Sequence, residues 1–100
     1  MTVRIGINGF GRIGRNIFRQ ALMTKGVEVV AINDLTDANM LAHLLKYDSV
    51  HGKLNEKITV HDNSIQVGHK EIAVFSESDP VKIDWKSNDV EVVIESTGRF

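Results

Sequence analysis

A glycine-rich turn near the start of the chain, Gly9-Phe10-Gly11-Arg12-Ile13-Gly14, constrains the fold more than any other feature. Ahead of it, Val3, Ile5 and Ile7 alternate with other residues, which is the pattern of a strand with one apolar face. Behind it, apolar residues recur at helical spacing as far as Leu22. A strand, a tight turn and a helix in this order predict an anion-binding site at the start of the helix.

The predicted helix spans residues 11–24, with Ile13 and Ala21 facing inward and Arg19 facing solvent. In the strand before it, Gly6 leaves room for a helix to pack closely on the second face. Residues 27–33 are rich in β-branched side chains, as is typical of a strand buried on both faces. The two strands and the helix therefore predict a βαβ unit with parallel strands and a right-handed connection.

The remaining chain extends this unit. Residues 37–46 carry an apolar stripe that includes Met40 and predict a second helix, capped by Thr36 or Asp37. Short apolar runs between residues 58 and 75, separated by turn residues, predict antiparallel hairpins. Asp79-Pro80 predicts the start of a helix or turn. Strands near residues 72–76 and 91–95 complete the set, and the latter is expected beside residues 2–8.

These elements predict an α/β fold of the Rossmann type, with a doubly wound and mostly parallel sheet. The 100 residues would supply the first βαβ half and the start of the second half, as the N-terminal part of one dinucleotide-binding domain. No repeat or linker divides them. We expect the catalytic domain of such a protein to lie outside this chain.

Each glycine of the turn has a separate steric reason. Gly9 permits the sharp turn, Gly11 lets a pyrophosphate approach the backbone, and Gly14 lets the helix pack against the strand. Asp34 follows Gly14 by twenty residues, the spacing at which an acidic residue accepts hydrogen bonds from a ribose. Its charge would repel a 2'-phosphate, which favours NAD over NADP. In the alternative interpretation, Asp34 only starts the turn into the next helix.

The amino-acid composition argues against several classes of function. The sequence has no Cys, so it offers no disulfide, thiolate metal site or cysteine nucleophile. A formal net charge of −1 gives no bulk attraction to DNA or an anionic membrane, and no apolar run reaches the length of a membrane span. The four histidines lack partners at ligand spacing, so no metal site is predicted. A cytoplasmic enzyme or part of one is the expectation, with RNA binding at most a secondary role.

Several segments, in this order, resemble the glyceraldehyde-3-phosphate dehydrogenases. They are Ile7-Asn8-Gly9-Phe10-Gly11-Arg12-Ile13-Gly14-Arg15, Ala31-Ile32-Asn33-Asp34-Leu35, Leu44-Leu45-Lys46-Tyr47-Asp48-Ser49-Val50-His51-Gly52 and Glu95-Ser96-Thr97-Gly98-Arg99-Phe100. The resemblance implies an NAD site. Its residues would be Gly9, Phe10, Gly11, Arg12, Ile13, Gly14, Asn33, Asp34, Ser78, Ser96, Thr97, Gly98 and Phe100. Many bacterial members of that family carry an adenine-contacting Arg where this chain has Ser78.

The same resemblance implies the reaction. In this family an aldehyde, glyceraldehyde 3-phosphate, is oxidised with phosphate to an acyl phosphate, 1,3-bisphosphoglycerate, through a thioester on a Cys. A His acts as base, NAD takes the hydride, and the enzyme is a homotetramer. No catalytic residue is expected within these 100 residues, and the chain alone is expected to be inactive. Two alternatives stay open: an erythrose-4-phosphate dehydrogenase or related enzyme of the superfamily, and a non-catalytic nucleotide-binding or RNA-binding module.

Overall fold

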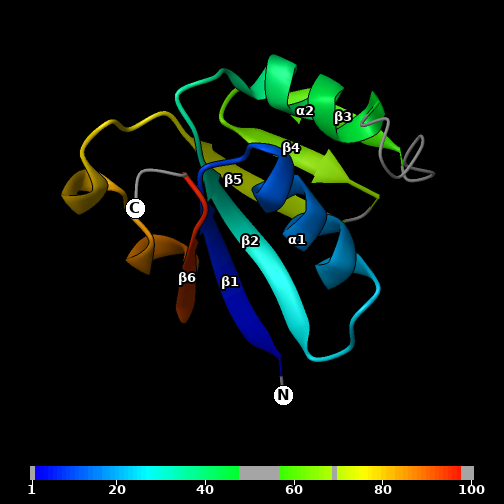
Figure 1. The fold of residues 1–100 in the computed structure, drawn as a ribbon, viewed down its shortest axis with the longest axis horizontal. Helices are drawn as coiled ribbons and strands as arrows, with labels where there is room; N and C mark the ends of the chain where they lie inside the picture. Colours follow the sequence, from blue (N-terminus) through cyan, green and yellow to red (C-terminus); the bar gives the residue numbers. More distant parts are fainter. Residues whose placement is uncertain (1, 48–56, 69, 98–100) are drawn as a thin grey trace.

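The computed structural model describes residues 2–47, 57–68 and 70–97 of the chain. Within these residues, six strands form one sheet, accompanied by two α-helices and two short 3-10 helices (Figure 1). In chain order the elements are β1 (Val3–Asn8), α1 (Arg12–Leu22), β2 (Val27–Asn33), α2 (Ala38–Tyr47), β3 (Ile58–His61), β4 (Ser64–Val67), β5 (Lys70–Phe75), η1 (Pro80–Lys82), η2 (Lys86–Asn88) and β6 (Val92–Glu95).

The strand order in the sheet is β3-β4-β5-β2-β1-β6. Neighbours among β5, β2, β1 and β6 are parallel, whereas β3, β4 and β5 form antiparallel hairpins. This arrangement confirms the α/β Rossmann-type prediction, the antiparallel excursion and the place of β6 beside β1. Strand β5 begins at Lys70, two residues before the expected start, because its first residues pair with β4.

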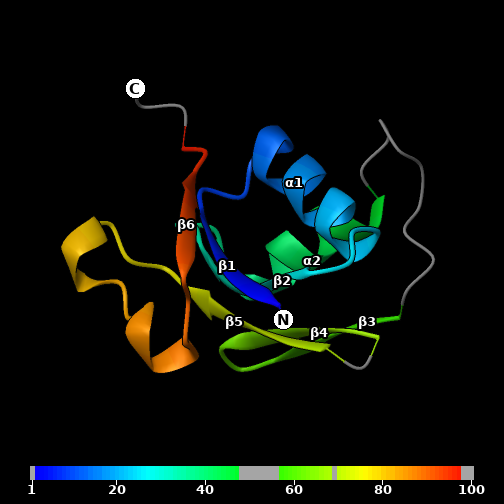
Figure 2. The same ribbon diagram turned by 90° about the horizontal axis from the view of Figure 1, so that it is seen from below.

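Both α-helices lie on the same face of the sheet (Figure 2), where α1 packs on β2 and α2 packs on β3 and β4. The buried side chains between these layers form one core, and each such side chain stabilises the fold by about 1.5–3 kcal/mol. Its largest fully buried members are Phe10, Phe18, Ile7, Ile32, Leu41, Leu45, Ile65 and Ile72. Asp37 caps α2, since its carboxylate accepts a hydrogen bond of 2.8 Å from the N–H of Met40.

Three predictions about helix faces are wrong. Ile13 is 66% exposed and Met40 is 48% exposed, although both were expected in the core. Arg19 was expected in solvent but is only 8% exposed, and its guanidinium donates to the carbonyl of Leu45 in the last turn of α2. The carbonyls at a helix end lack partners within the helix, so a nearby cation is stabilised there. For Arg19, this hydrogen bond to the end of α2 thus overrides the orientation predicted from residue spacing.

The second face of the sheet is covered differently from the prediction. The space beside Gly6 is occupied by Trp85, the residue before η2, and a Cβ on Gly6 would lie 2.7 Å from its ring. Trp85 also meets Phe75 of β5, with ring centroids 6.1 Å apart and planes nearly perpendicular. An aromatic side chain, and not an α-helix, therefore fills this position. No helix in residues 2–47, 57–68 and 70–97 is long and apolar enough to cross a membrane.

Candidate functional site

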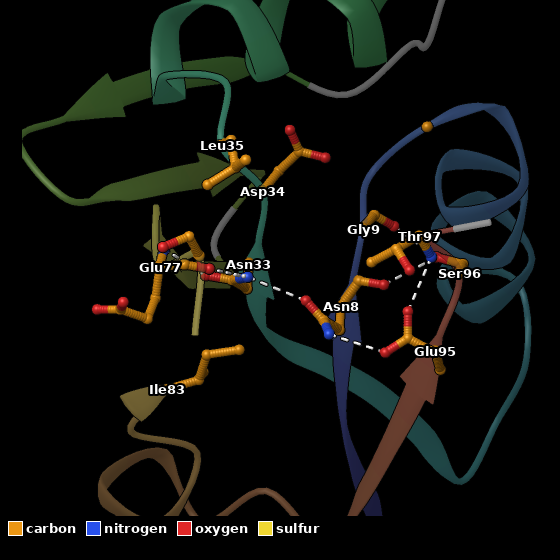
Figure 3. Close-up of a pocket in the computed structure, with 12 residues that line it drawn as sticks. Asn8, Gly9, Asn33, Asp34, Leu35, Glu77, Ile83, Glu95, Ser96 and Thr97 are labelled. Atoms are coloured by element: carbon orange, nitrogen blue, oxygen red, sulfur yellow. Dashed lines mark hydrogen bonds between the residues drawn. The ribbon is translucent and has the colours of Figure 1, made fainter. Parts of the chain in front are cut away.

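A pocket of about 380 Å³ lies where the carboxyl ends of β1, β2 and β6 meet (Figure 3). This edge is the usual place for a ligand in an open parallel sheet. The residues that line the pocket come from the three strand ends, the glycine turn and the segment after β5. They are Asn8, Gly9, Gly11, Asn33, Asp34, Leu35, Glu77, Ser78, Ile83, Glu95, Ser96 and Thr97.

Gly9 makes the turn out of β1 with a φ of +96°, a region that side chains strongly disfavour. Its N–H donates to the carbonyl of Asn33 at 2.7 Å, which joins the turn to the end of β2. A Cβ at Gly9 would lie 2.7 Å from the backbone nitrogen of Thr97. The turn therefore fits only a glycine, and the segment after β6 packs directly on it.

Gly11 and Gly14 differ in their surroundings. A Cβ on Gly14 would overlap the carbonyl oxygen of Gly9 and lie 3.3 Å from the Ile7 side chain. This glycine therefore lets α1 pack against the end of the β1 strand, as predicted, and against the turn that follows it. A Cβ on Gly11 would meet nothing within 4 Å, and Gly11 is the N-cap of α1 without a side-chain capping bond. The fold itself thus gives no steric reason for Gly11, which borders the pocket.

The N-cap residue Gly11 borders the pocket, and the first turn of α1 carries no acidic side chain. Arg12 and Ile13, which were predicted at the cofactor site, are not among the residues that line the pocket. Arg12 and Ile13 are exposed there, whereas Gly14 is buried. The positive end of the helix dipole and a nearby guanidinium favour an anion at this position. A phosphate site beside the glycine turn stays a prediction, which this electrostatic arrangement favours.

Asp34 is fixed by two backbone hydrogen bonds. One carboxylate oxygen accepts from the N–H of Phe10 at 2.7 Å, and the other accepts from the N–H of Thr36 at 3.0 Å. The bond to Thr36 is the turn-starting role of the alternative interpretation, so that role is confirmed. Asp34 can still accept hydrogen bonds from a ligand, because each carboxylate oxygen can accept more than one hydrogen bond. Asp34 is half-buried and borders the pocket.

Phe10 reaches the site only through its backbone. Its ring is 1% exposed and packs edge-to-face on Phe18, with centroids 5.9 Å apart. The turn directs this ring into the core, so the prediction of Phe10 as a cofactor residue now concerns its backbone. The Phe10 N–H still contributes, since it orients Asp34.

The structure also brings together polar residues that the sequence analysis did not single out: Asn8, Glu77 and Glu95. Asn8 and Glu95 lie opposite each other in register at the ends of β1 and β6. The signal that could have revealed them is a polar residue at the end of each of two strands, buried at Asn8 and exposed at Glu95. Ser78, Ser96 and Thr97 line the pocket as predicted, and the Ser96 hydroxyl donates to the carbonyls of Gly9 and Asn8. Gly98 and Phe100 lie outside the described residues.

No group of three or more His, Asp or Glu side chains in the described part of the chain is placed to hold a metal ion. His61 instead contacts the side chain of Gln66 across the β3-β4 hairpin at 3.3 Å. The polar groups around the pocket are backbone donors, two amides, three carboxylates and hydroxyls. Among them, the donors at the glycine turn suit a phosphate and the Asp34 carboxylate suits a ribose.

Comparison with known proteins agrees with this geometry. A sequence profile described as "Glyceraldehyde 3-phosphate dehydrogenase, NAD binding domain" matches residues 3–100. The chain belongs to this family. The matched part of the family is its NAD binding domain, and the cofactor of this chain is therefore NAD.

Three curated proteins are similar to this chain over nearly all of its length. The chain is 62% identical over 100 residues to glyceraldehyde-3-phosphate dehydrogenase 1 of Bacillus subtilis and 60% identical over 100 residues to the glyceraldehyde-3-phosphate dehydrogenase of Geobacillus stearothermophilus. Over 97 residues it is 65% identical to glyceraldehyde-3-phosphate dehydrogenase 1 of Bacillus cereus. These matches cover 100%, 100% and 97% of this chain. The chain spans about 30% of the length of these relatives.

Proposed function

We propose that the pocket at the strand ends binds the adenosine half of NAD, with the pyrophosphate at the start of α1. The observation that carries this proposal is the Asp34 carboxylate, held at the pocket by the Phe10 N–H. The residues proposed to surround the cofactor are Gly9, Gly11, Arg12, Ile13, Asn33, Asp34, Leu35, Ser78, Ser96 and Thr97, with Gly14 supporting the turn. Gly98 and Phe100 are also proposed to contact the cofactor, on the basis of the family resemblance alone.

Asp34 also accounts for the choice of NAD over NADP. A carboxylate accepts hydrogen bonds from the ribose 2'- and 3'-hydroxyls, but it repels a 2'-phosphate. The neighbouring Leu35 is 59% exposed and carries no charge that could offset this repulsion. Arg12, the nearest cation in the motif, lies at the other end of the glycine turn. The pocket therefore favours the cofactor without the 2'-phosphate.

The whole protein is proposed to oxidise glyceraldehyde 3-phosphate with phosphate to 1,3-bisphosphoglycerate, reducing NAD. Identities of 60–65% to relatives of that name support this proposal. The sequence contains no Cys, so the thiol of the reaction would come from residues beyond these 100. The homotetramer, the cytoplasmic setting and the position in glycolysis that the resemblance implies belong to the same proposal.

Cofactor titration by calorimetry tests the proposed site. Asp34→Asn removes the charge and keeps the shape, and we expect NAD affinity to fall about tenfold or more, as for loss of a hydrogen bond to a charged group. NADP affinity should fall less or rise. Asp37→Asn is the matched control, because it makes the same chemical change three residues away and keeps a good helix cap. Equal affinity of the parent chain for NAD and NADP would contradict the assignment of Asp34.

The proposed reaction needs a separate experiment. Joining this chain to the remaining part of the Bacillus subtilis relative gives a hybrid whose NAD site comes from this chain. We expect the hybrid to reduce NAD only when glyceraldehyde 3-phosphate and phosphate are both present, and Asp34→Asn in the hybrid should raise KM for NAD. A folded hybrid that binds NAD but does not reduce it with this substrate would contradict the proposed reaction.

A further inference from the structure

Two buried asparagines lie beneath the pocket. Asn8 is 8% exposed and Asn33 is 5% exposed, and they are paired in register at the ends of β1 and β2. A buried amide is costly unless its donors and acceptor are used. Both side chains are hydrogen-bonded to each other and to groups on opposite sides of the pocket (Figure 3).

The backbone N–H of Glu77 determines which atom donates and which accepts in each of these hydrogen bonds. The backbone N–H of Glu77 can only donate, and it donates to Oδ1 of Asn33 at 2.9 Å. Nδ2 of Asn33 therefore donates, to the carbonyl of Glu77 at 3.0 Å and to Oδ1 of Asn8 at 2.9 Å. This leaves Nδ2 of Asn8 facing Oε2 of Glu95, which accepts at 2.8 Å.

Glu95 ends this series as an acceptor on both sides. Its second oxygen, Oε1, accepts from the backbone N–H of Thr97 at 2.9 Å. A carboxylate can accept on both oxygens, whereas an amide has only donors at its nitrogen. Glu77, Asn33, Asn8, Glu95 and Thr97 thus form one directional set of hydrogen bonds, the polar relay, in which no single member can be reversed.

We propose that Asn33, Asn8 and Glu95 are positioning residues that set the separation between the two walls of the cofactor pocket. Glu77 precedes Ser78 on one wall, and Thr97 belongs to the other wall. The polar relay links them through the ends of β2, β1 and β6, beneath the space proposed for the adenosine. This inference rests on the proposed NAD site. It adds Asn8 and Glu95 to that site and gives Asn33 a positioning role, exerted on the cofactor through the pocket walls.

Two substitutions break the polar relay in opposite ways. Asn33→Asp places an acceptor against the Asn8 oxygen and against the Glu77 carbonyl. Glu95→Gln places a donor against either the Asn8 amide or the Thr97 N–H. An unmatched polar group in place of a hydrogen bond is destabilising, more so at the buried Asn33 than at the exposed Glu95. We expect each single variant to bind NAD about tenfold more weakly than the parent chain.

The double variant Asn33→Asp, Glu95→Gln is expected to recover. The Asn8 amide can then turn over, donate to the new carboxylate at position 33 and accept from the new amide at position 95, whose oxygen still accepts from Thr97. NAD affinity should return to within about threefold of the parent chain, since the walls are linked again with the direction reversed. Stability should recover less, because the bond from position 33 to the Glu77 carbonyl stays broken.

The test is calorimetric titration of the parent chain, both single variants and the double variant with NAD, AMP and inorganic pyrophosphate. The exposed Asn39→Asp and Glu71→Gln make the same chemical changes away from the pocket and serve as controls. Thermal unfolding of each variant gives its folded fraction. We expect NAD and AMP affinities to fall together in the single variants, whereas pyrophosphate affinity stays within about twofold, because the start of α1 is not part of the polar relay.

Four other outcomes would overturn the positioning role of Asn33, Asn8 and Glu95. If the parent chain binds neither NAD nor AMP, the proposed function fails and the positioning role fails with it. If the parent binds NAD and the single variants bind it equally well, only the positioning role is overturned. A double variant no better than the weaker single variant, or an equal loss for all three ligands, indicates that these residues only stabilise the fold. Should Asn33→Asp not fold, Glu95→Gln at an exposed position still decides, through its ratio of AMP to pyrophosphate affinity.

Discussion

Alanine substitutions at Gly9, Gly11 and Gly14 separate the folding role of the glycine turn from its binding role. The three glycines share one motif, but a methyl group at each would meet a different environment. At Gly9 and Gly14 it would meet backbone atoms of the chain, and at Gly11 it would point into open space. We therefore expect the first two substitutions to act on stability and the third to act on the cofactor.

Gly9→Ala carries two costs. An L-residue held at a φ of +96° is strained by about 1–2 kcal/mol. Its Cβ would also lie 2.7 Å from the Thr97 nitrogen, and backbone cannot move aside as cheaply as a flexible side chain. Forcing an extra carbon into a packed site costs about 1–3 kcal/mol. The free energy of unfolding should fall by about 2–5 kcal/mol, which is a large share of the stability of a small domain.

Gly14→Ala has one cost and one gain. Alanine is favoured over glycine inside a helix by about 1 kcal/mol. Its methyl group, however, would overlap the Gly9 carbonyl oxygen and lie 3.0 Å from the Ser96 hydroxyl. Separating α1 from the turn disrupts the packing of the whole first helix, so we expect a net loss of about 1–3 kcal/mol in the free energy of unfolding.

Gly11→Ala should leave the fold nearly unchanged. Alanine is a poorer N-cap than glycine, but it also restricts the unfolded chain, and the two effects offset each other to within about 0.5 kcal/mol. NAD affinity should fall at least about tenfold, because the methyl group would stand where the pyrophosphate approaches the backbone.

Urea unfolding and NAD calorimetry measure the two effects separately. The single tryptophan of the sequence, Trp85, packs on Gly6 and gives an intrinsic fluorescence probe of folding. A Gly11→Ala variant that loses as much stability as Gly9→Ala would refute the steric reasoning. A stable Gly11→Ala variant that binds NAD like the parent chain would refute the proposed position of the pyrophosphate.

Three further predictions concern residues outside the turn. Arg19→Ala should lower the free energy of unfolding by about 1–3 kcal/mol in urea titrations, because the last turn of α2 loses a charged donor, whereas the exposed Arg12→Ala should change it by less than about 0.5 kcal/mol. Hydrogen bonds from the side chain and backbone of Ser87 hold the pKa of Asp84 below its ordinary value. Its contribution to stability is therefore present at neutral pH and lost as the pH falls through that lowered pKa, and an NMR titration should give a lower midpoint for the folded chain than for the chain in urea. Ser78→Arg places a planar cation at the pocket wall and should tighten AMP binding about twofold to fivefold by calorimetry, as expected for a cation stacked on a ring.

Local patterns predicted the first half of the fold well. The alternation in β1, the glycine turn and the β-branched run of β2 depend mostly on neighbouring residues, and the expected strand bounds agree with the structure. Helix faces were less predictable. Arg19 is buried because α2 presents a helix end to it, a tertiary contact that residue spacing in α1 does not reveal. The same reason explains why Trp85 rather than an α-helix covers Gly6.

The candidate site shows the same division. The positions of Gly9, Gly14 and Asp34 beside the turn were predictable, since they follow from the turn and from the spacing within one βαβ unit. The hydrogen bond between Asn8 and Glu95 was not, because the two residues are 87 positions apart in the sequence. Only the pairing of β1 with β6 brings these polar side chains together.

The glycine turn is therefore completed by a part of the chain far from the motif. The Ser96 hydroxyl donates to the Gly9 carbonyl across 87 residues, and the Thr97 backbone occupies the space that a side chain at Gly9 would need. The positive φ at Gly9 is thus stabilised from outside the βαβ unit, by the segment that follows β6. A motif of strand, turn and helix can be read in the first 34 residues, but its geometry depends on β6 lying beside β1. Placement of β6 beside β1 is consequently needed both for the turn and for the pocket, because Ser96 and Thr97 contact Gly9 and also line the pocket.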